Sequence, residues 1–206
     1  MEILRLEEVG VERAAKRAAE MLRKGKLVLY PTDTLYGLGA DATNARALAL
    51  LRELKGREKK KPLSVLVPDH ASISRYAHLN DTARALAERF LPGALTLVLP
   101  ATDRIPAEIT LNGAIGIRIP DDSFSLALAR AFGKPVTATS ANKSGRETPA
   151  TVEEVICQFG PDAHEIALAI DGGSRKGNIG STVVSIVSDT PYVLREGAIT
   201  RTALGI

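Results

Sequence analysis

A cluster of small polar residues near position 30 has the composition of a ligand-binding site. The apolar residues 27–29 end at Tyr30-Pro31, and Thr32, Asp33 and Thr34 follow before the glycines of residues 37–39. In open α/β sheets ligands bind beyond the carboxyl ends of strands, and glycines let a ligand come close to the backbone. We therefore expect a binding site here, although Thr-Asp-Thr also occurs in ordinary turns and helix caps.

Cations and short hydroxyl-rich loops recur farther along the chain. Lys55 and Arg57 stand at a predicted helix end, where the helix dipole favours cations whatever their function. Arg118 alternates with isoleucines on a predicted strand, and its guanidinium needs an anionic partner only if that face of the sheet is covered. The small residues of 140–145 and 172–181 can present backbone N–H groups to phosphate or carboxylate. Together these features favour a site for a polyanion and a small polar molecule.

Several familiar chemistries lack their motif. No Gly-x-x-x-x-Gly-Lys-Ser/Thr is present, and the loose dinucleotide pattern at residues 37–42 is separated from its strand by residues 31–36. The histidines at 70, 78 and 164 are too scattered for a zinc site and are expected at the surface. The single cysteine, Cys157, excludes an internal disulfide, and we expect it to be a small packing residue in a helix.

The composition is that of a folded protein outside the membrane. The chain has 206 residues, of which 45% are apolar and 25% charged, enough to bury a sizeable core. No stretch approaches the length of a membrane span, and the N-terminus lacks the pattern of a signal peptide, so we expect a cytoplasmic protein. The net charge of +3 suits an anionic ligand or weak nucleic-acid contact.

Alternating helices and strands must position these residues. Apolar periodicity and capping residues predict helices at 11–24, 45–55, 81–90, 123–132 and 151–159, and strands at 27–30, 63–67, 95–99, 115–119, 135–139, 166–170, 182–187 and 192–195. This order predicts an α/β fold with an open, twisted, mixed sheet and flanking helices. No repeat or composition break divides the chain, so we expect a single catalytic domain over residues 1–206.

Five segments in combination resemble a known family. They are Tyr30-Pro-Thr-Asp-Thr-Leu-Tyr-Gly-Leu-Gly39, Lys55-Gly-Arg57 before Pro62-Leu63, Gly116-Ile-Arg-Ile-Pro120, Ser140-Ala-Asn-x-Ser-Gly145 and Ser181-Thr-Val-Val184. Over nearly the whole chain they are similar to the YrdC-like domain of threonylcarbamoyl-AMP synthases, of which the Lys-x-Arg and Ser-x-Asn pairs are the signature. The resemblance implies a concave, positively charged cleft. It also implies synthesis of threonylcarbamoyl-AMP and pyrophosphate from L-threonine, bicarbonate and ATP, for the N6-threonylcarbamoyladenosine modification of tRNA.

The resemblance also implies roles for individual residues. L-Threonine would contact Thr34, Arg118 and Ser181, and its carboxylate would bind to Arg118. ATP would lie among Lys55, Arg57, Lys61, Ser140, Asn142 and Arg195. Lys55 and Arg57 would be catalytic through charge stabilisation, with Mg²⁺ bound through the ATP phosphates and no metal site built by the protein. Lys61, where members often have asparagine, and Asp122, where many have histidine, depart from the family pattern.

Partners and alternatives follow from the same resemblance. Besides its substrates, the chain would contact tRNA at most as an accessory property, and it would supply a downstream threonylcarbamoyl transferase complex. It would be the short form that lacks an extra C-terminal domain. One alternative is a double-stranded RNA or tRNA-binding module, for which the basic run at Lys59 and Lys60 would serve, although a solvated helix end is the simpler interpretation of that run. Another alternative is a paralogous carbamoyl-handling enzyme, because the same domain occurs in carbamoyltransferases of hydrogenase maturation.

Overall fold

The computed structural model describes residues 1–58, 61–175, 179–188 and 190–206, so Lys59 and Lys60 lie outside the described residues. The helices are α1 Leu6–Val9, α2 Val11–Arg23, α3 Ala45–Lys55, α4 His70–Tyr76, α5 Asp81–Phe90, α6 Ser123–Phe132, α7 Val152–Phe159 and α8 Arg201–Leu204, with 3₁₀ turns at Ala107–Ile109 and Gly160–Glu165. The strands are β1 Glu2–Arg5, β2 Leu27–Tyr30, β3 Gly37–Gly39, β4 Ser64–Leu66, β5 Leu95–Pro100, β6 Ala114–Arg118, β7 Val136–Thr137, β8 Thr139–Ser140, β9 Ile166–Asp171, β10 Thr182–Ser185 and β11 Tyr192–Arg195. Each element predicted from the sequence has a counterpart in these ranges.

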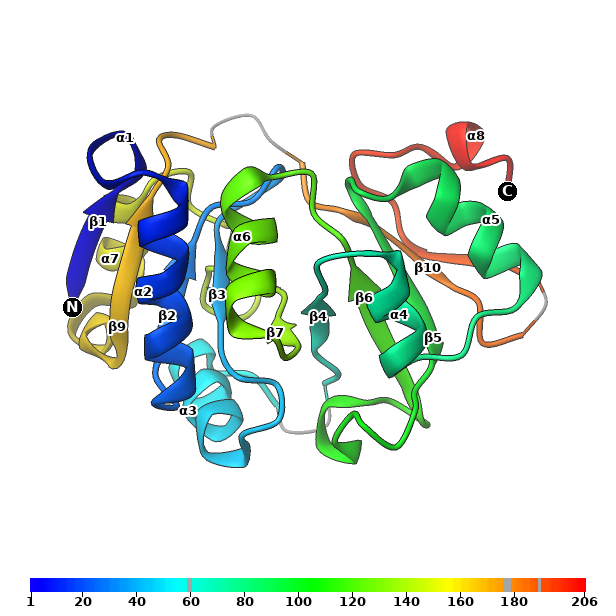
Figure 1. Cartoon of the computed structure of the whole chain (residues 1–206), viewed down its shortest axis with the longest axis horizontal. Coiled ribbons are helices and arrows are strands. Elements are labelled where there is room, and N and C mark those ends of the chain that lie inside the picture. The colour runs from blue at the N-terminus through cyan, green and yellow to red at the C-terminus, as the bar shows by residue number, and fades with distance from the viewer. Residues whose placement is uncertain (59–60, 176–178, 189) are drawn as a thin grey trace.

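The strands form two mixed sheets that meet at β7 and β8 (Figure 1). The first sheet has the order β1-β9-β2-β3-β8 and the second β11-β10-β5-β6-β4-β7. Ala138 alone separates β7 of the second sheet from β8 of the first. The predicted mixed α/β fold with flanking helices is confirmed, and its strands divide between two mixed sheets.

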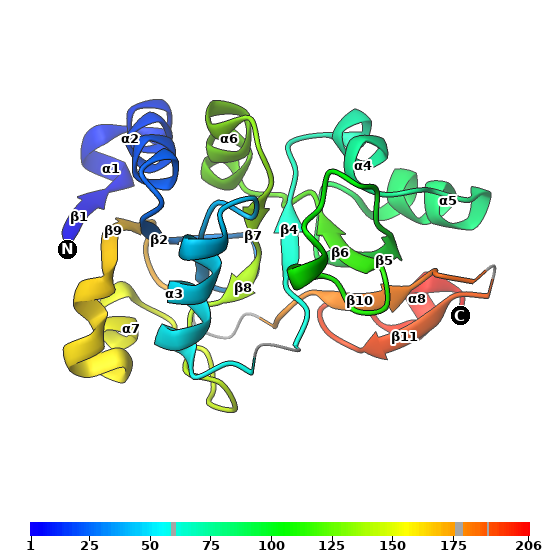
Figure 2. The same ribbon diagram turned by 90° about the horizontal axis from the view of Figure 1, so that it is seen from below.

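Helices cover both faces of the first sheet and one face of the second. Figure 2 shows α2, α6, α4 and α5 along one side of the two sheets, with α3 and α7 on the other side of the first. Helices α2 and α6 pack together over the first sheet, where Leu22 and Leu128 belong to one buried cluster with Val28 and Leu168. The side opposite α4 and α5 is therefore where polar residues of both sheets can meet.

Helix α3 brings a lysine into the protein interior. The side chain of Asn44 caps the helix by accepting hydrogen bonds from the backbone N–H groups of Arg46 and Ala47, at 3.0 and 3.2 Å. Gly56 ends it with a left-handed backbone, φ +59°. Between these points the buried face continues past the apolar residues to Lys55, which is only 2% exposed. The cap and the helical period together place the ammonium of Lys55 beneath the loop of Ser140 and Asn142.

The glycines after the first polar cluster make room for an aromatic ring. Strand β3 pairs with β2, and a Cβ atom on Gly37 or Gly39 would lie 2.7 or 3.0 Å from the ring of Tyr30. Tyr30 is buried and donates a hydrogen bond to the carbonyl of Thr137 at 3.0 Å, and its burial raises the pKa of the phenol. These glycines therefore permit packing beneath the site, while the approach of a ligand to their backbone stays a prediction.

Two expectations for reactive side chains have different outcomes. His70, His78 and His164 are exposed, as expected. Cys157 was expected to pack inside a helix, and this is wrong: it lies on the exposed face of α7, whose buried residues are Val152, Val155 and Phe159. The helix itself was predicted correctly, but its apolar face falls at other positions.

Candidate active site

A cleft of about 940 Å³ opens where the two sheets meet. Its walls come from the β2–β3 loop and β8 of the first sheet and from β4, β5, β6, β10 and β11 of the second. Seven of the predicted site residues line it: Thr34, Arg57, Arg118, Ser140, Asn142, Ser181 and Arg195. Lys55 and Lys61 are not among the lining residues. The structure thus joins the predicted threonine residues and most of the predicted ATP residues in one cavity.

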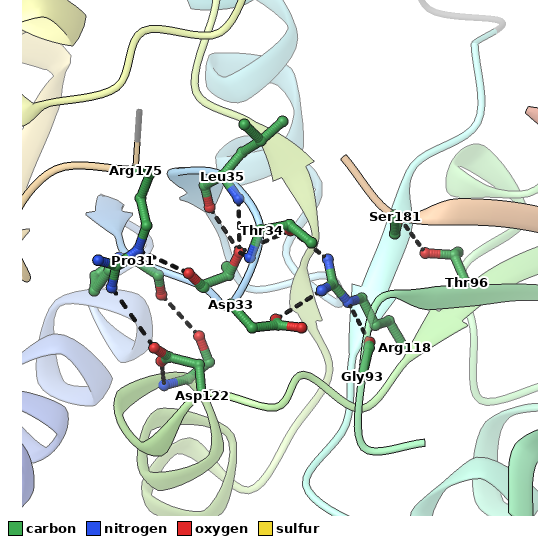
Figure 3. A network of polar contacts seen from close by, with 12 residues as sticks. Pro31, Asp33, Thr34, Leu35, Gly93, Thr96, Arg118, Asp122, Arg175 and Ser181 are labelled. Atoms are coloured by element: carbon green, nitrogen blue, oxygen red, sulfur yellow. Dashed lines mark hydrogen bonds and ion pairs between the residues drawn. The ribbon is translucent and has the colours of Figure 1, made fainter. Parts of the chain in front are cut away.

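Arg118 lies at the junction of the two sheets and is 6% exposed. The face of the strand that carries its guanidinium is therefore covered, which is the case in which it needs an anionic partner. Figure 3 shows its guanidinium reaching from β6 to the β2–β3 loop of the first sheet. It donates to Oδ1 of Asp33 at 2.6 Å, to Oγ1 of Thr34 at 2.9 Å and, through Nε, to the carbonyl of Gly93 at 2.9 Å. A guanidinium has five N–H donors. Two of them therefore remain available to a ligand.

The β2–β3 loop is held by its own hydroxyl groups. Oγ1 of Thr32 accepts hydrogen bonds from the backbone N–H groups of Thr34 and Leu35 at 3.1 and 3.2 Å, and it donates to the carbonyl of Leu35 at 2.7 Å. The hydroxyls of Thr32 and Thr34 lie 3.0 Å apart. This network fixes the side chain of Thr34 toward Arg118 before any ligand binds.

Ser181 lies on the opposite wall, just before β10. Its hydroxyl is 2.9 Å from that of Thr96 on β5, and both residues are buried. Arg195 on β11 donates to the carbonyl of Ser181 at 2.8 Å and to its hydroxyl at 3.3 Å. Both guanidiniums line the cleft, and partial burial, followed by the positive charge of Arg118, lowers the pKa of Arg195.

Lys55 supports the Ser140–Asn142 loop from below. Its ammonium donates to the carbonyl of Ser140, to the carbonyl of Asn142 at 2.7 Å and to Oδ1 of Asn142 at 3.5 Å. Three acceptors match the three donors of an ammonium group. Burial, and then the charge of Arg57, lower the pKa of Lys55 to about 7. The structure therefore makes Lys55 a support of this loop in the ligand-free protein.

Arg57 is a partly buried cation without a carboxylate partner among the described residues. It donates to the carbonyl of Pro62 at 2.8 Å, while its Nε is buried without a hydrogen bond. Burial, and then the charge of Arg52, lower the pKa of Arg57. A buried charge is costly without a partner. An anionic ligand in the cleft would supply that partner.

The predicted Ser-x-Asn pair is a compact loop on β8. The hydroxyl of Ser140 donates to Oδ1 of Asn142, and Nδ2 of Asn142 donates to the carbonyls of Lys143 and Arg146 at 3.0 and 2.6 Å. Because Lys55 donates to the backbone carbonyls of Ser140 and Asn142, the loop is fixed from two sides. Ser140 and Asn142 both line the cleft.

The two departures from the family pattern have local explanations. Lys61 is exposed, and its ammonium is 2.9 Å from the carboxylate of Glu58, so the structure does not bring it to the cleft with the other predicted ATP residues. Asp122 caps helix α6 by accepting a hydrogen bond from the N–H of Ser125 at 2.8 Å. Its other oxygen is 3.8 Å from Arg175. Asp122 thus has a structural role behind the β2–β3 loop.

Three residues of this region were not assigned a role from the sequence. Asp33 forms the ion pair with Arg118, Thr96 bonds to Ser181, and Arg175 donates to the carbonyl of Thr32 at 2.8 Å. Asp33 stood within the quoted polar cluster, so its carboxylate was a usable signal. Thr96 alternates with leucines on β5 much as Arg118 does with isoleucines. Arg175 had no such signal, because its contact joins residues 143 positions apart.

The described residues contain neither a cluster of metal ligands nor a membrane-spanning helix. No group of three or more His, Cys, Asp or Glu side chains lies together as a metal site in that part of the chain. Among the helices that the structure describes, none is long and apolar enough to cross a membrane.

The fold and site define an α/β protein whose two mixed sheets enclose a cationic, hydroxyl-lined cleft, and comparisons identify its family. The sequence profile of the Sua5/YciO/YrdC family, described as "Telomere recombination", matches residues 20–197. A putative threonylcarbamoyl-AMP synthase of Methanocaldococcus jannaschii is 39% identical over 201 residues, which are 96% of this chain and 93% of that protein. The threonylcarbamoyl-AMP synthase of Bacillus subtilis is 40% identical over 195 residues, or 90% of this chain and 54% of that protein. The chain belongs to the Sua5/YciO/YrdC family.

A solved structure gives the same result for the fold. The crystal structure of Pyrococcus abyssi Sua5 complexed with L-threonine matches with a TM-score of 0.87 and 35% identity, over 96% of this chain and 57% of that one. The chain therefore spans little more than half the length of this relative and of the Bacillus protein, and nearly all of the Methanocaldococcus protein. The family resemblance inferred from the sequence is confirmed.

Proposed function

We propose that the chain is an L-threonylcarbamoyladenylate synthase, a nucleotidyltransferase that makes threonylcarbamoyl-AMP and pyrophosphate from L-threonine, bicarbonate and ATP. The names of its relatives support this proposal over an RNA-binding module or a carbamoyl-handling paralogue. The observation that carries it is one cleft lined by Arg118 and Ser181 and also by the partly buried Arg57, which has no carboxylate partner among the described residues. Arg118 suits the carboxylate of an amino acid, and Arg57 suits a triphosphate.

The chemistry requires positioning more than a protein nucleophile. The amine of threonine and bicarbonate combine, with loss of water, to give a carbamate. A carbamate oxygen then attacks the α-phosphorus of ATP, and the bond from that phosphorus to the bridging oxygen of pyrophosphate breaks. Two anions must approach each other in this step, so fixed cations and hydrogen-bond donors lower its barrier. Arg57 and Arg195 would stabilise the phosphates, and Lys55 would act with them while it holds the Ser140–Asn142 loop.

Arg118 and Thr34 would hold the amino acid in this scheme. The two free N–H donors of Arg118 would bind the threonine carboxylate, and the hydroxyls of Thr34 and Ser181 would border the rest of the molecule. Asn142 and Ser140 would contact ATP from the wall above Lys55. Lys61 would also contact ATP, and for this its ammonium would have to leave the carboxylate of Glu58.

Mg²⁺ enters the proposal with the nucleotide. The phosphate oxygens of ATP would hold it, as is usual for this hard cation, and it would neutralise part of the charge that develops on pyrophosphate. We further propose a cytoplasmic location, a single catalytic unit over residues 1–206, and delivery of the adenylate to a downstream threonylcarbamoyl transferase complex. Contact with tRNA is proposed as an accessory property.

Pyrophosphate release tests the proposal. Purified protein should release pyrophosphate from ATP only when L-threonine and bicarbonate are both present. Omission of threonine, or its replacement by L-alanine, is the matched control for background ATP hydrolysis. Pyrophosphate release at the same rate with and without L-threonine would contradict the proposal.

A further inference from the structure

Four arginines line the cleft, Arg57, Arg118, Arg146 and Arg195, and among the described residues only Arg118 forms an ion pair with a carboxylate. Arg118 is 2.6 Å from Asp33, and the side chains of this pair are 8% and 15% exposed. The hydrogen bonds of Arg57 and Arg195 go to neutral groups, the carbonyl of Pro62 and the carbonyl and hydroxyl of Ser181. Arg118 is therefore charge-compensated within the protein, whereas Arg57 and Arg195 are not, although Glu147 and Glu196 also line the cleft.

Asp33 lies behind Arg118 and not on the cleft wall, from which it is absent. Figure 3 shows the carboxylate meeting the guanidinium from the β2–β3 loop, while Gly93 takes its Nε–H. A ligand in the cleft would thus touch Arg118 without touching Asp33. The carboxylate can act on the ligand only through the orientation and net charge of this arginine.

Without Asp33 the cations would form one continuous field. Arg118 and Arg195 both line the cleft, Arg195 contacts Ser181 on the wall opposite Arg118, and the charge of Arg118 contributes to lowering the pKa of Arg195. A triphosphate or pyrophosphate binds most strongly where cations are uncompensated, whereas a zwitterionic amino acid has little net charge. In such a field phosphates would compete for the position of the amino-acid carboxylate.

We propose that Asp33 is a positioning residue that sets the ligand selectivity of Arg118, keeping phosphates out of the amino-acid end of the cleft. The inference rests on the proposed function and adds to it how one cleft binds a polyanion and an amino acid side by side. Electrostatic repulsion of the wrong ligand is a general way to obtain such specificity.

The wild-type protein provides the first test. Calorimetry measures the dissociation constant of L-threonine with and without saturating inorganic pyrophosphate. Because the proposal places the two ligands at separate ends, the threonine constant should change by less than about twofold. Competitive displacement of threonine by pyrophosphate in the wild type would overturn the proposal, and this test needs no variant that has to fold.

Asp33→Asn provides the second test, because the amide oxygen can still accept from Arg118 while the charge is lost. Pyrophosphate should bind about tenfold tighter and should now compete with threonine. Asp122→Asn is the matched control: it removes the charge beside Arg175, keeps a residue able to cap α6, and should behave as the wild type. A folded Asp33→Asn protein with wild-type pyrophosphate binding would overturn the proposal.

Threonine-dependent pyrophosphate release by the wild type, measured on the same preparation, separates this inference from the proposed function. If release fails while the binding results hold, the proposed reaction is wrong and the selectivity of the cleft stands. If release occurs while pyrophosphate displaces threonine, the reaction stands and the role of Asp33 is wrong.

Discussion

At the scale of single residues, Arg118 shows how far the sequence leads. Its place between isoleucines predicted a strand and left open whether its face was covered, and β6 with 6% exposure gives the answer. The pairing of Arg118 with Asp33 could not be predicted, because the two residues are 85 positions apart and only the meeting of the two sheets brings them together. Lys55 is similar: the motif marked it, but only the packing of α3 shows that it supports the Ser140 loop.

Arg118→Ala should raise the KM for threonine far more than the KM for ATP. The loss of a largely buried, charge-assisted contact costs about 3 kcal/mol, roughly a hundredfold. Arg118→Lys should recover little of it, because lysine lacks the planar pair of donors. Steady-state kinetics with each substrate varied measures the effect, and Arg130→Ala on the exposed side of α6 is the control. Equal losses for the two substrates would contradict the assignment of Arg118 to threonine.

ATP binding at pH 8 should take up protons. Burial holds the pKa of Lys55 at about 7, so this amine is mostly neutral at pH 8 in the free protein. The phosphates favour its charged form and raise the pKa, which draws protons from the buffer. Calorimetry in two buffers with different ionisation enthalpies measures the uptake. Lys55→Met should abolish it, and a wild-type binding enthalpy that is independent of the buffer would show that Lys55 does not sense the nucleotide.

At the scale of elements, most helices and strands were predictable because their signals are local. Asn44 and Gly56 mark both ends of α3, and Thr151 with Glu154 marks the start of α7. The short strands β1 and β3 were missed, since their few residues form strands only through partners elsewhere in the chain. The sheet to which each strand belongs depends on such non-local pairing, so the two-sheet arrangement could not be derived from periodicity.

The loop after β8 should matter for the nucleotide and not for the amino acid. Ser140→Ala combined with Asn142→Ala removes a hydroxyl and an amide from the cleft wall. The change also removes Oδ1 of Asn142, one of the acceptors of the Lys55 ammonium. Each hydrogen bond to a charged ligand is worth about 1 to 3 kcal/mol, so ATP affinity should fall at least tenfold. Equilibrium binding of ATP and of threonine to wild type and variant measures the difference. A larger loss for threonine would reverse the assignment of the two ends.

At the scale of the whole molecule, the question is whether the cleft or the basic surface carries the function. Arg57→Ala should abolish most pyrophosphate release, because Arg57 lines the cleft without a carboxylate partner among the described residues. The double change Lys59→Ala/Lys60→Ala, outside the described residues, should leave release nearly intact. Any retention of tRNA should fall steeply between low and physiological salt, as phosphate contacts do. Greater damage to synthesis from the double change would favour the RNA-binding alternative.

The central claim is that one cleft joins threonine, bicarbonate and ATP into a single adenylate. The most direct measurement follows ¹³C-labelled bicarbonate and L-threonine into the products by mass spectrometry while pyrophosphate is quantified. The account predicts one AMP ester that contains both the labelled carbon and threonine, formed with an equal amount of pyrophosphate, and none when any substrate is omitted. Pyrophosphate released with an unlabelled or threonine-free AMP product would contradict it.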